Sequence, residues 1–238
     1  FASSPRTQIL ITGSSTIAPL MLEVAKRFEQ KHLKVRVDVQ TGGSSRGIAD
    51  QLRGTAQLGM VSRSLKSQEN HLQNFLIAKD GICMIVHRSN PLQNLSSQQI
   101  AAIYKGEINQ WSKLGWVKAK DALIDVVHKA EGRSTLEVFL KHFQLRNLEV
   151  RPSVIIGDNE QAIKTVQGNP YAIAYVSIGT AAYHQKNKVS IKALALDGVR
   201  ASVENVRKGI FPLARELNLV VKNPSSWTRK LIQFTQSL

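Results

Sequence analysis

The alternation of strand and helix patterns along the chain predicts an α/β fold with mainly parallel sheets. Residues 9–11 form a short apolar run, and residues 33–39 alternate apolar and polar side chains with the period of a half-buried strand. Between these segments Leu20, Val24 and Phe28 recur every four residues, which indicates one face of a helix. A strand, a helix and a second strand in this order imply a crossover and a parallel pair of strands.

The same alternation continues to the end of the chain, without an internal repeat or a low-complexity segment. Further strands are expected at 57–61, 82–86, 124–127, 171–176 and 217–221, and further helices from residue 46 and at 97–104, 135–143, 159–167 and 227–234. No linker marks a domain boundary. Gly81 and the stretch 177–184 are the best candidates for positions where the chain crosses between domains.

The composition indicates a folded protein whose partners are anions. The 238 residues suit one large domain or two modest ones, and the net charge of +15 attracts anions over long range. Nucleic acid and anionic lipid also fit this charge, but the basic residues are scattered and form no block. No apolar run approaches the roughly 18 residues that a membrane span needs. Residues 1–6 show no leader pattern, which we interpret as a mature or trimmed chain.

Catalytic and metal-binding patterns are not found in the sequence. The six histidines lack the spacing of metal ligands, and neither a dinucleotide-binding fingerprint nor a P-loop is present. Ser15 lacks the surroundings of a nucleophile elbow. The lone cysteine, Cys83, lies in an apolar run and is interpreted as a small buried hydrophobic residue. We therefore expect no enzyme activity, no cofactor and no metal.

Three segments, called here the elbows, place glycines and hydroxyl side chains between a predicted strand and a predicted helix. The first elbow spans residues 13–16, the second residues 42–47 and the third residues 131–135. Helix N-termini present unpaired N–H groups and a partial positive charge, and hydroxyls add neutral donors, so each elbow suits an anion. One elbow alone is explained by a capped helix, but three favour a shared ligand at the carboxyl ends of the strands.

The chain resembles the phosphate-binding proteins of the type II periplasmic-binding-protein fold. The resemblance rests on Gly-Ser-Ser-Thr-Ile-Ala-Pro at 13–19, Gly-Gly-Ser-Ser-Arg-Gly at 42–47, Gly-Met-Val-Ser-Arg at 59–63, Ser-Asn-Pro-Leu at 89–92, Ile-Tyr-Lys-Gly-Glu-Ile-Asn-Gln-Trp at 103–111, Tyr-Ala-Ile-Ala-Tyr-Val-Ser at 171–177, Asp-Gly-Val at 197–199 and Glu-Asn-Val at 204–206. It implies two lobes joined by a two-segment hinge. Lobe 1 would comprise residues 1–80 and 186–238, and lobe 2 residues 81–185, with the third elbow on lobe 2.

The resemblance also implies which residues bind the anion. Ser15 would donate its hydroxyl and Thr16 its backbone N–H, while Lys129 would take the place of the usual arginine without its bidentate fork. Arg133 stands where a serine is usual, and either returns a guanidinium to the site or points to solvent. The full set of expected ligand-binding residues is Ser15, Thr16, Ser44, Ser45, Arg63, Lys129, Glu131, Arg133, Ser134 and Thr135.

The main departure from the family pattern is Arg63, where well-known phosphate receptors have an aspartate that accepts the proton of hydrogen phosphate. Arg63 could instead pair with two oxygens of a dianion. Without an acid at this position the selectivity for phosphate over sulfate depends on another acceptor. Glu131 is one candidate, and its alternative role is a salt bridge to Lys129.

The resemblance implies an extracytoplasmic, monomeric binding protein that closes on inorganic phosphate and delivers it to the permease subunits of an ABC importer. Within the family, a general oxyanion binder and a secreted scavenging or signalling protein remain open. More distant alternatives are a phosphatase and a basic nucleic-acid binder, for which the sequence has neither a nucleophile–base pair nor a recognisable reader motif.

Overall fold

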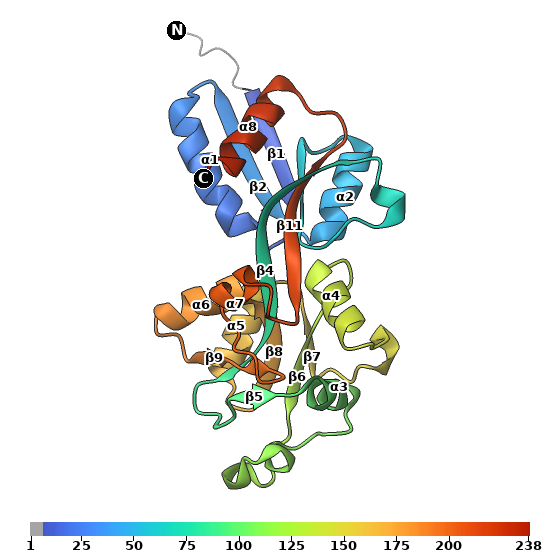
Figure 1. Cartoon of the computed structure of the whole chain (residues 1–238), viewed down its shortest axis with the longest axis vertical. Coiled ribbons are helices and arrows are strands. Elements are labelled where there is room, and N and C mark those ends of the chain that lie inside the picture. Colours follow the sequence, from blue (N-terminus) through green and yellow to red (C-terminus); the bar gives the residue numbers. More distant parts are fainter. Residues whose placement is uncertain (1–6) are drawn as a thin grey trace. The chain divides into compact units, whose positions relative to one another are not determined.

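The computed structural model describes residues 7–238 and divides the chain into two compact units. Residues 1–6, in which the sequence shows no leader pattern, lie outside the described residues. Among the described residues, unit 1 comprises residues 7–78, Gly132–Ser134 and Glu216–Leu238, and unit 2 comprises Lys79–Glu131 and Thr135–Arg215. The predicted α/β class is confirmed, since strands and helices alternate through both units (Figure 1).

Unit 1 is built on the strands β1 (Thr7–Gly13), β2 (Val35–Thr41), β3 (Leu58–Val61) and β11 (Ala214–Val221), in the order β2-β1-β3-β11. The crossover helix α1 (Ala18–Lys31) joins β1 to β2, and these strands pair in parallel with Ile9 opposite Val37. The predicted first βαβ unit is therefore confirmed. β11 pairs with β3 in the antiparallel sense, so this sheet is mixed rather than wholly parallel.

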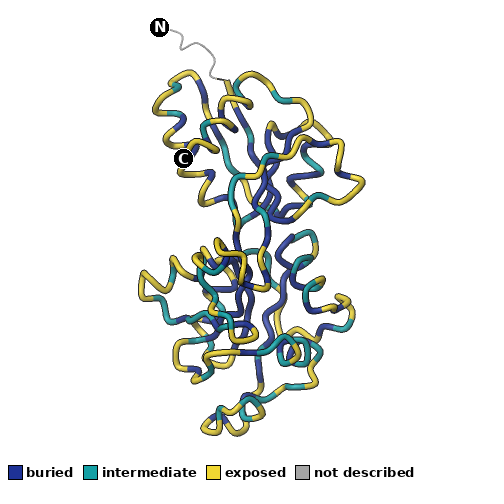
Figure 2. The backbone as a smooth tube through the Cα atoms, viewed as in Figure 1, coloured by how far each residue is buried: buried dark blue, intermediate teal, exposed yellow. Residues whose placement is uncertain are grey.

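Helices cover both faces of the unit 1 sheet. On one face α1 and α8 (Ser226–Gln236) bury Phe28 and Leu231 against the strands, and on the other face α2 (Ser44–Arg53) buries Ile48. Neighbouring residues of β11 alternate between the two cores, since Leu219 lies in the first and Val220 in the second. Figure 2 shows the buried strands between more exposed helices.

Unit 2 surrounds a second, larger core. Its sheet contains the later part of β4 (Gln73–His87), then β8, β6 and β7, with β9 on β4. β6 pairs in parallel with β7 and β8, whereas β4 pairs antiparallel with β8 and β9. The bounds are β6 Asp125–Lys129, β7 Val154–Ile156, β8 Ala172–Ser177 and β9 Ile191–Ala193, and a separate two-stranded sheet joins β5 Asn94–Leu95 to β10 Ala195–Leu196.

The helices of unit 2 pack an aromatic group against this sheet. Phe139 of α4 stacks on Tyr175 of β8 with 3.9 Å between ring centroids, and both rings are fully buried. The helices are α3 Ser97–Lys105, α4 Ser134–His142, α5 Asn159–Gly168, α6 Ile178–Lys186 and α7 Val203–Arg207, and the 3-10 turns are η1 Ser67–Glu69, η2 Trp111–Leu114, η3 Val117–Ala119 and η4 Asn147–Glu149.

The chain passes between the units at places that differ from the expected ones. The first passage, between Ala78 and Lys79, lies in β4 close to the expected Gly81. The expected stretch 177–184 is instead the start of α6, which Ser177 caps by accepting from Thr180 N. Residues 186–215 belong to unit 2 and not to lobe 1 as expected, because β9 pairs with β4 there.

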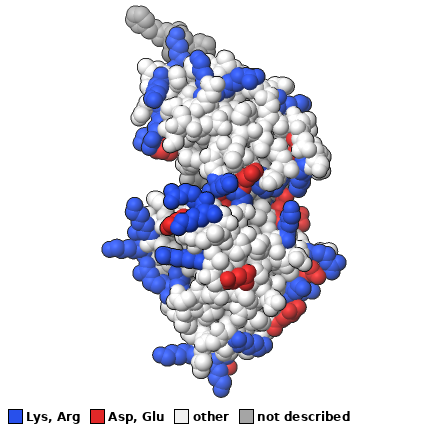
Figure 3. Space-filling model, in the orientation of Figure 1, with Lys and Arg blue, Asp and Glu red and all other residues white. Residues whose placement is uncertain are grey.

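On the face seen in Figure 3, Lys and Arg side chains are frequent on both units, and acidic side chains are fewer. No helix among residues 7–238 has both the length and the apolar character needed to span a bilayer. Cys83 is buried as expected, and burial raises the pKa of its thiol, which makes the thiol unreactive.

Candidate functional site

The first elbow follows β1 at a point where only glycine fits. Gly13 has φ of +133°, and a Cβ there would lie 2.3 Å from the carbonyl oxygen of Met60 on the neighbouring strand. Pro19 stands in the first turn of α1, and the N-cap residue is Ile17, which has no hydroxyl. The Thr16 N–H, expected to bind the anion, donates to Ser14 Oγ at 3.2 Å. Ser15 is half-buried.

The second elbow packs directly on the first. The N–H groups of Gly42 and Gly43 both donate to the carbonyl oxygen of Gly13 at 3.0 Å. Gly43, the N-cap of α2, has φ of +89°, which favours glycine. The helix then begins at Ser44, which is buried, while Ser45 beside it is half-buried.

Residues 132–134 of the third elbow belong to unit 1 with the other two elbows, whereas Glu131 and Thr135 belong to unit 2, so the elbow does not lie wholly on the second lobe as expected. Ser45 N–H donates to the carbonyl oxygen of Gly132 at 3.2 Å. A Cβ on Gly43 would meet that same oxygen at 2.6 Å and Arg133 Cδ at 2.9 Å, so glycine permits this close approach. The stem of Arg133 thus packs on the second elbow. The predicted convergence of the three elbows is found within this unit.

Buried serine hydroxyls connect the elbows. Ser14 Oγ donates to Ser62 Oγ at 2.8 Å, and Ser44 Oγ donates to Ser134 Oγ at 2.9 Å. Ser62 Oγ and Ser134 Oγ are also hydrogen-bonded to each other. Ser14 and Ser62 were absent from the expected site, because their positions in the sequence give no sign that they meet.

Arg63 follows Ser62 and forms a buried ion pair inside unit 1. Its Nη1 and Nη2 donate to the two carboxylate oxygens of Glu69 at 2.8 and 3.0 Å, and Nη1 also donates to the Ser64 carbonyl. Arg63 is 5% exposed and Glu69 is 7% exposed. The guanidinium fork that we expected to grasp two anion oxygens therefore holds an internal carboxylate, which neutralises its charge.

In unit 2, Lys129 lies at the end of β6 and is buried. Its Nζ donates to Asn159 Oδ1 at 2.8 Å, at the first residue of α5. The expected alternative, a salt bridge from Lys129 to Glu131, is not found among the described residues. Glu131 is exposed, and its Oε1 accepts from Asn147 Nδ2 at 3.3 Å.

A directed series of hydrogen bonds runs from Lys129 to Glu131. The Lys129 N–H donates to Tyr175 Oη, and Tyr175 Oη contacts His128 Nδ1 at 3.0 Å. His128 Nε2 contacts Asn147 Oδ1 at 2.9 Å. Because Asn147 Oδ1 can only accept, His128 carries its proton on Nε2, and neutral Nδ1 accepts from Tyr175. His128 is thus held neutral in the strand beside Lys129.

We expect this buried histidine to make stability depend on pH. Burial lowers the pKa of His128, although the Asn147 hydrogen bond opposes this shift, and burial also lowers the pKa of His142. The unfolded chain then binds more protons below about pH 6.5, so stability is complete above that pH and falls as the pH drops toward the folded pKa. The melting temperature, followed from pH 8 to 5, should fall, and His128→Asn should flatten the slope more than His142→Asn. An equal slope in all three proteins would contradict this role.

Two buried charges that sequence analysis missed flank the passages between the units. Arg215 Nε and Nη2 donate to Asp80 Oδ2 at 3.1 and 3.0 Å, and Ser177 Oγ donates to Asp80 Oδ1 at 2.9 Å. Arg215 Nη1 also donates to Thr135 Oγ1 at 2.8 Å. The Thr135 oxygen accepts this bond, and its hydroxyl hydrogen remains available to donate. In the sequence, the available sign of this pair was that Asp80 and Arg215 each stand just before an apolar strand segment, at 82–86 and 217–221.

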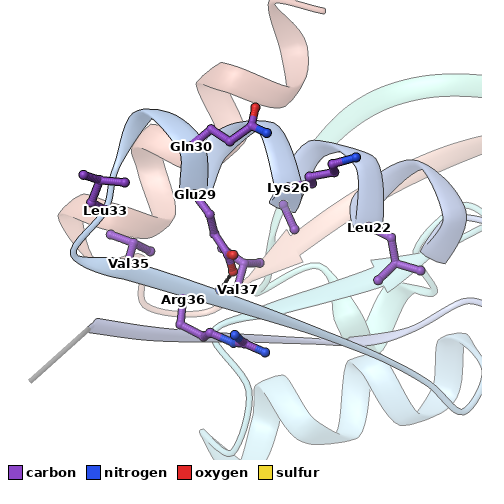
Figure 4. A pocket seen from close by; sticks show the side chains of 9 residues that line it. Leu22, Lys26, Glu29, Gln30, Leu33, Val35, Arg36 and Val37 are labelled. Carbon is purple, nitrogen blue, oxygen red and sulfur yellow. Dashed lines mark hydrogen bonds between the residues drawn. The ribbon is translucent and has the colours of Figure 1, made fainter.

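A surface hollow of unit 1 lies away from the elbows, between α1 and β2 (Figure 4). There Glu29 Oε1 accepts from the Val37 N–H at 2.6 Å, on the edge strand of the sheet. This bond covers a backbone donor at the sheet edge and so limits pairing with another strand. The hollow is lined by Leu22, Ala25, Lys26, Glu29, Gln30, Leu33, Val35, Arg36 and Val37.

Two α/β units whose helices begin at glycine- and hydroxyl-rich segments are typical of a solute-binding protein. The chain belongs to the family described as the PBP superfamily domain, whose model matches residues 2–237.

Known proteins of this family resemble the chain over most of its length. The phosphate-binding protein PstS of Bacillus subtilis is 27% identical over 209 residues, 86% of this chain and 67% of that protein. The protein of the same name from Pseudomonas aeruginosa is 28% identical over 92% of this chain and 74% of its own length. A putative phosphate ABC transporter substrate-binding protein from Clostridium perfringens, solved with bound phosphate, has a TM-score of 0.88 and 32% identity, and the match covers 96% of this chain and 92% of that one.

Proposed function

We propose that the protein binds inorganic phosphate and delivers it to the permease subunits of an ABC importer. The observation that carries the proposal is the meeting of three hydroxyl-bearing elbows in unit 1, where Ser45 N–H reaches the Gly132 carbonyl and serine hydroxyls connect all three. Such a cluster offers a small anion several neutral donors at helix starts. The bound phosphate of the Clostridium perfringens relative supports the choice of ligand.

Each unit, considered by itself, holds residues that we propose as anion ligands. From unit 1 these are the elbow hydroxyls and N–H groups together with Arg133, whose stem packs on Gly43. From unit 2 Lys129 supplies a buried cation, and Thr135 supplies a hydroxyl that Arg215 orients as a donor. Arg63 is proposed to act through its pair with Glu69 and not as a free cation.

Isothermal titration calorimetry of protein freed of anions by dialysis tests the proposal. Phosphate added at pH 7.5 should bind at one site per chain, with an affinity that chloride does not reproduce. Lys129→Met should weaken binding by at least tenfold, because a hydrogen bond from a charged group to an anion is among the stronger kinds. Absence of heat from phosphate, with the protein folded by circular dichroism, would overturn the assignment.

We further propose that the protein works outside the cytoplasm as a monomer and does no chemistry on its ligand. The names of its relatives as phosphate-binding and substrate-binding proteins support a role in binding. Light scattering after size exclusion should give one chain per particle with and without phosphate. A phosphate-dependent dimer, or turnover of a phosphate monoester, would contradict this part of the proposal.

A further inference from the structure

Four serine side chains of unit 1 form a connected group, called here the serine chain: Ser14, Ser62, Ser134 and Ser44. All are at most 3% exposed, and Ser44 and Ser62 are completely buried. Backbone N–H groups fix both ends, since Thr16 N–H donates to Ser14 Oγ and Ser62 N–H donates to Ser44 Oγ. The serine chain therefore connects all three elbows and has little access to bulk water.

The hydroxyl hydrogens of the serine chain outnumber the hydrogen bonds that join its hydroxyls. Four hydroxyls carry four hydrogens, but only three oxygen–oxygen contacts join them: Ser14 to Ser62, Ser62 to Ser134 and Ser44 to Ser134. Ser14 donates to Ser62, and Ser44 donates to Ser134. Among the described residues, one hydroxyl hydrogen thus has no acceptor, and it belongs to Ser62 or to Ser134.

The position of the two candidates decides between them. If Ser134 donated to Ser62, the spare hydrogen would remain on Ser62, which is completely buried, and an unmade bond there is costly. If Ser62 donates to Ser134, the spare hydrogen belongs to Ser134, beside Arg133 in the third elbow. Ser134 Oγ then accepts from both Ser62 and Ser44, so its lone pairs are used and it can only donate to a ligand.

We infer that the serine chain makes Ser134 a pure hydrogen-bond donor to the anion, so that the site accepts any small tetrahedral dianion and binds sulfate about as well as phosphate. The inference rests on the proposed function and names the ligand class of that same site. A site that rejects sulfate needs an acceptor for the proton of hydrogen phosphate. Position 63 provides none, because Arg63 stands there and its two Nη atoms bind Glu69. Glu131 is exposed and accepts from Asn147.

Calorimetry of the wild-type protein at pH 8, where most inorganic phosphate is a dianion, decides the inference without any variant. The dissociation constants of phosphate and sulfate should agree within about tenfold. A site built to accept the ligand's O–H group would instead reject a ligand without that group by about 10⁴-fold. Phosphate binding more than about a thousandfold tighter than sulfate overturns the inference and leaves the proposed function standing. If neither anion binds, the inference and the proposed function are both overturned.

Two variants test whether the serine chain is the cause. Ser62→Ala frees one lone pair of Ser134, which can then accept the proton of hydrogen phosphate, so phosphate should gain about tenfold relative to sulfate. Ser134→Ala should weaken both anions by about tenfold without changing their ratio. Ser67→Ala, at an exposed serine of η1, is the matched control. With melting temperatures showing folded proteins, an unchanged ratio in Ser62→Ala overturns the role of the serine chain.

Discussion

Arg215→Met is expected to lower the free energy of unfolding by about 3–5 kcal/mol, the range seen when one partner of a buried ion pair is removed. The substitution leaves the Asp80 carboxylate buried, with only Ser177 and the Gly179 N–H as donors within the described residues. The side chains of Arg215 and Asp80 are 1% and 7% exposed, so water cannot replace the guanidinium. Urea denaturation followed by circular dichroism measures the loss.

Two further proteins make this result specific to the pair. The double variant Asp80→Leu/Arg215→Met should recover most of the stability, because exchanging a buried pair for apolar residues is close to neutral. Arg27→Ala removes an exposed pair with Glu23 and should leave the denaturation midpoint unchanged. If Arg215→Met were as mild as Arg27→Ala, the pair would have no structural role.

Arg215→Met should also weaken phosphate binding by about tenfold. Arg215 Nη1 donates to Thr135 Oγ1, and without this donor the hydroxyl rotates freely and can turn its lone pairs toward the anion. Compared with Arg215→Met, Arg215→Lys should recover a larger share of the lost stability than of the lost phosphate affinity, since an ammonium keeps the charge but not the planar fork. Equal recovery of both would indicate that Arg215 acts on binding through stability alone.

The parts of the fold that the sequence predicts are those with a long or fully apolar pattern. The segment around Phe28 shows its period over most of α1, and the run from Ile82 to Val86 is buried on both faces of its sheet. The earlier half of β4 was missed because none of its residues before Asp80 is buried, although Phe75 and Ile77 pack partly on the core of unit 1. Strands of two or three residues, such as β9 and β10, are too short to show a period, and so residues 186–215 were assigned to the wrong unit.

The parts of the site formed by residues close together in the sequence were predictable, whereas the contacts between residues distant in the sequence were not. Each elbow shows its glycines and hydroxyls within a few residues, and the structure brings the elbows together as predicted. Ser14 and Ser62 are 48 residues apart, and Asp80 and Arg215 are 135 apart, so no local pattern could pair them. Arg63 was identified, but Glu69, which engages its fork, is the last residue of the 3-10 turn η1, which is too short to show a period in the sequence.

Glu69→Gln is expected to change stability and anion affinity in opposite directions, which distinguishes the two roles open to Arg63. Burial would raise the pKa of Glu69, but hydrogen bonds from Arg63 and the Lys66 N–H outweigh it and hold that pKa below its usual value. The carboxylate therefore stabilises the fold above the unfolded pKa, and this stability is lost as the pH falls through the folded value. The variant should lose about 3 kcal/mol at neutral pH and lack this acid dependence.

Removal of the Glu69 charge also leaves the charge of Arg63 without its carboxylate partner. A positive charge that is no longer neutralised attracts an anion more strongly, so phosphate should bind several-fold tighter in low salt, and the gain should shrink as salt is added. Calorimetry at two ionic strengths measures both effects, with Glu149→Gln, which removes the partner of the exposed Arg146, as the control. Weaker binding at both salts would mean that Glu69 positions Arg63 as a direct ligand, because the fork then needs its carboxylate to stay in place.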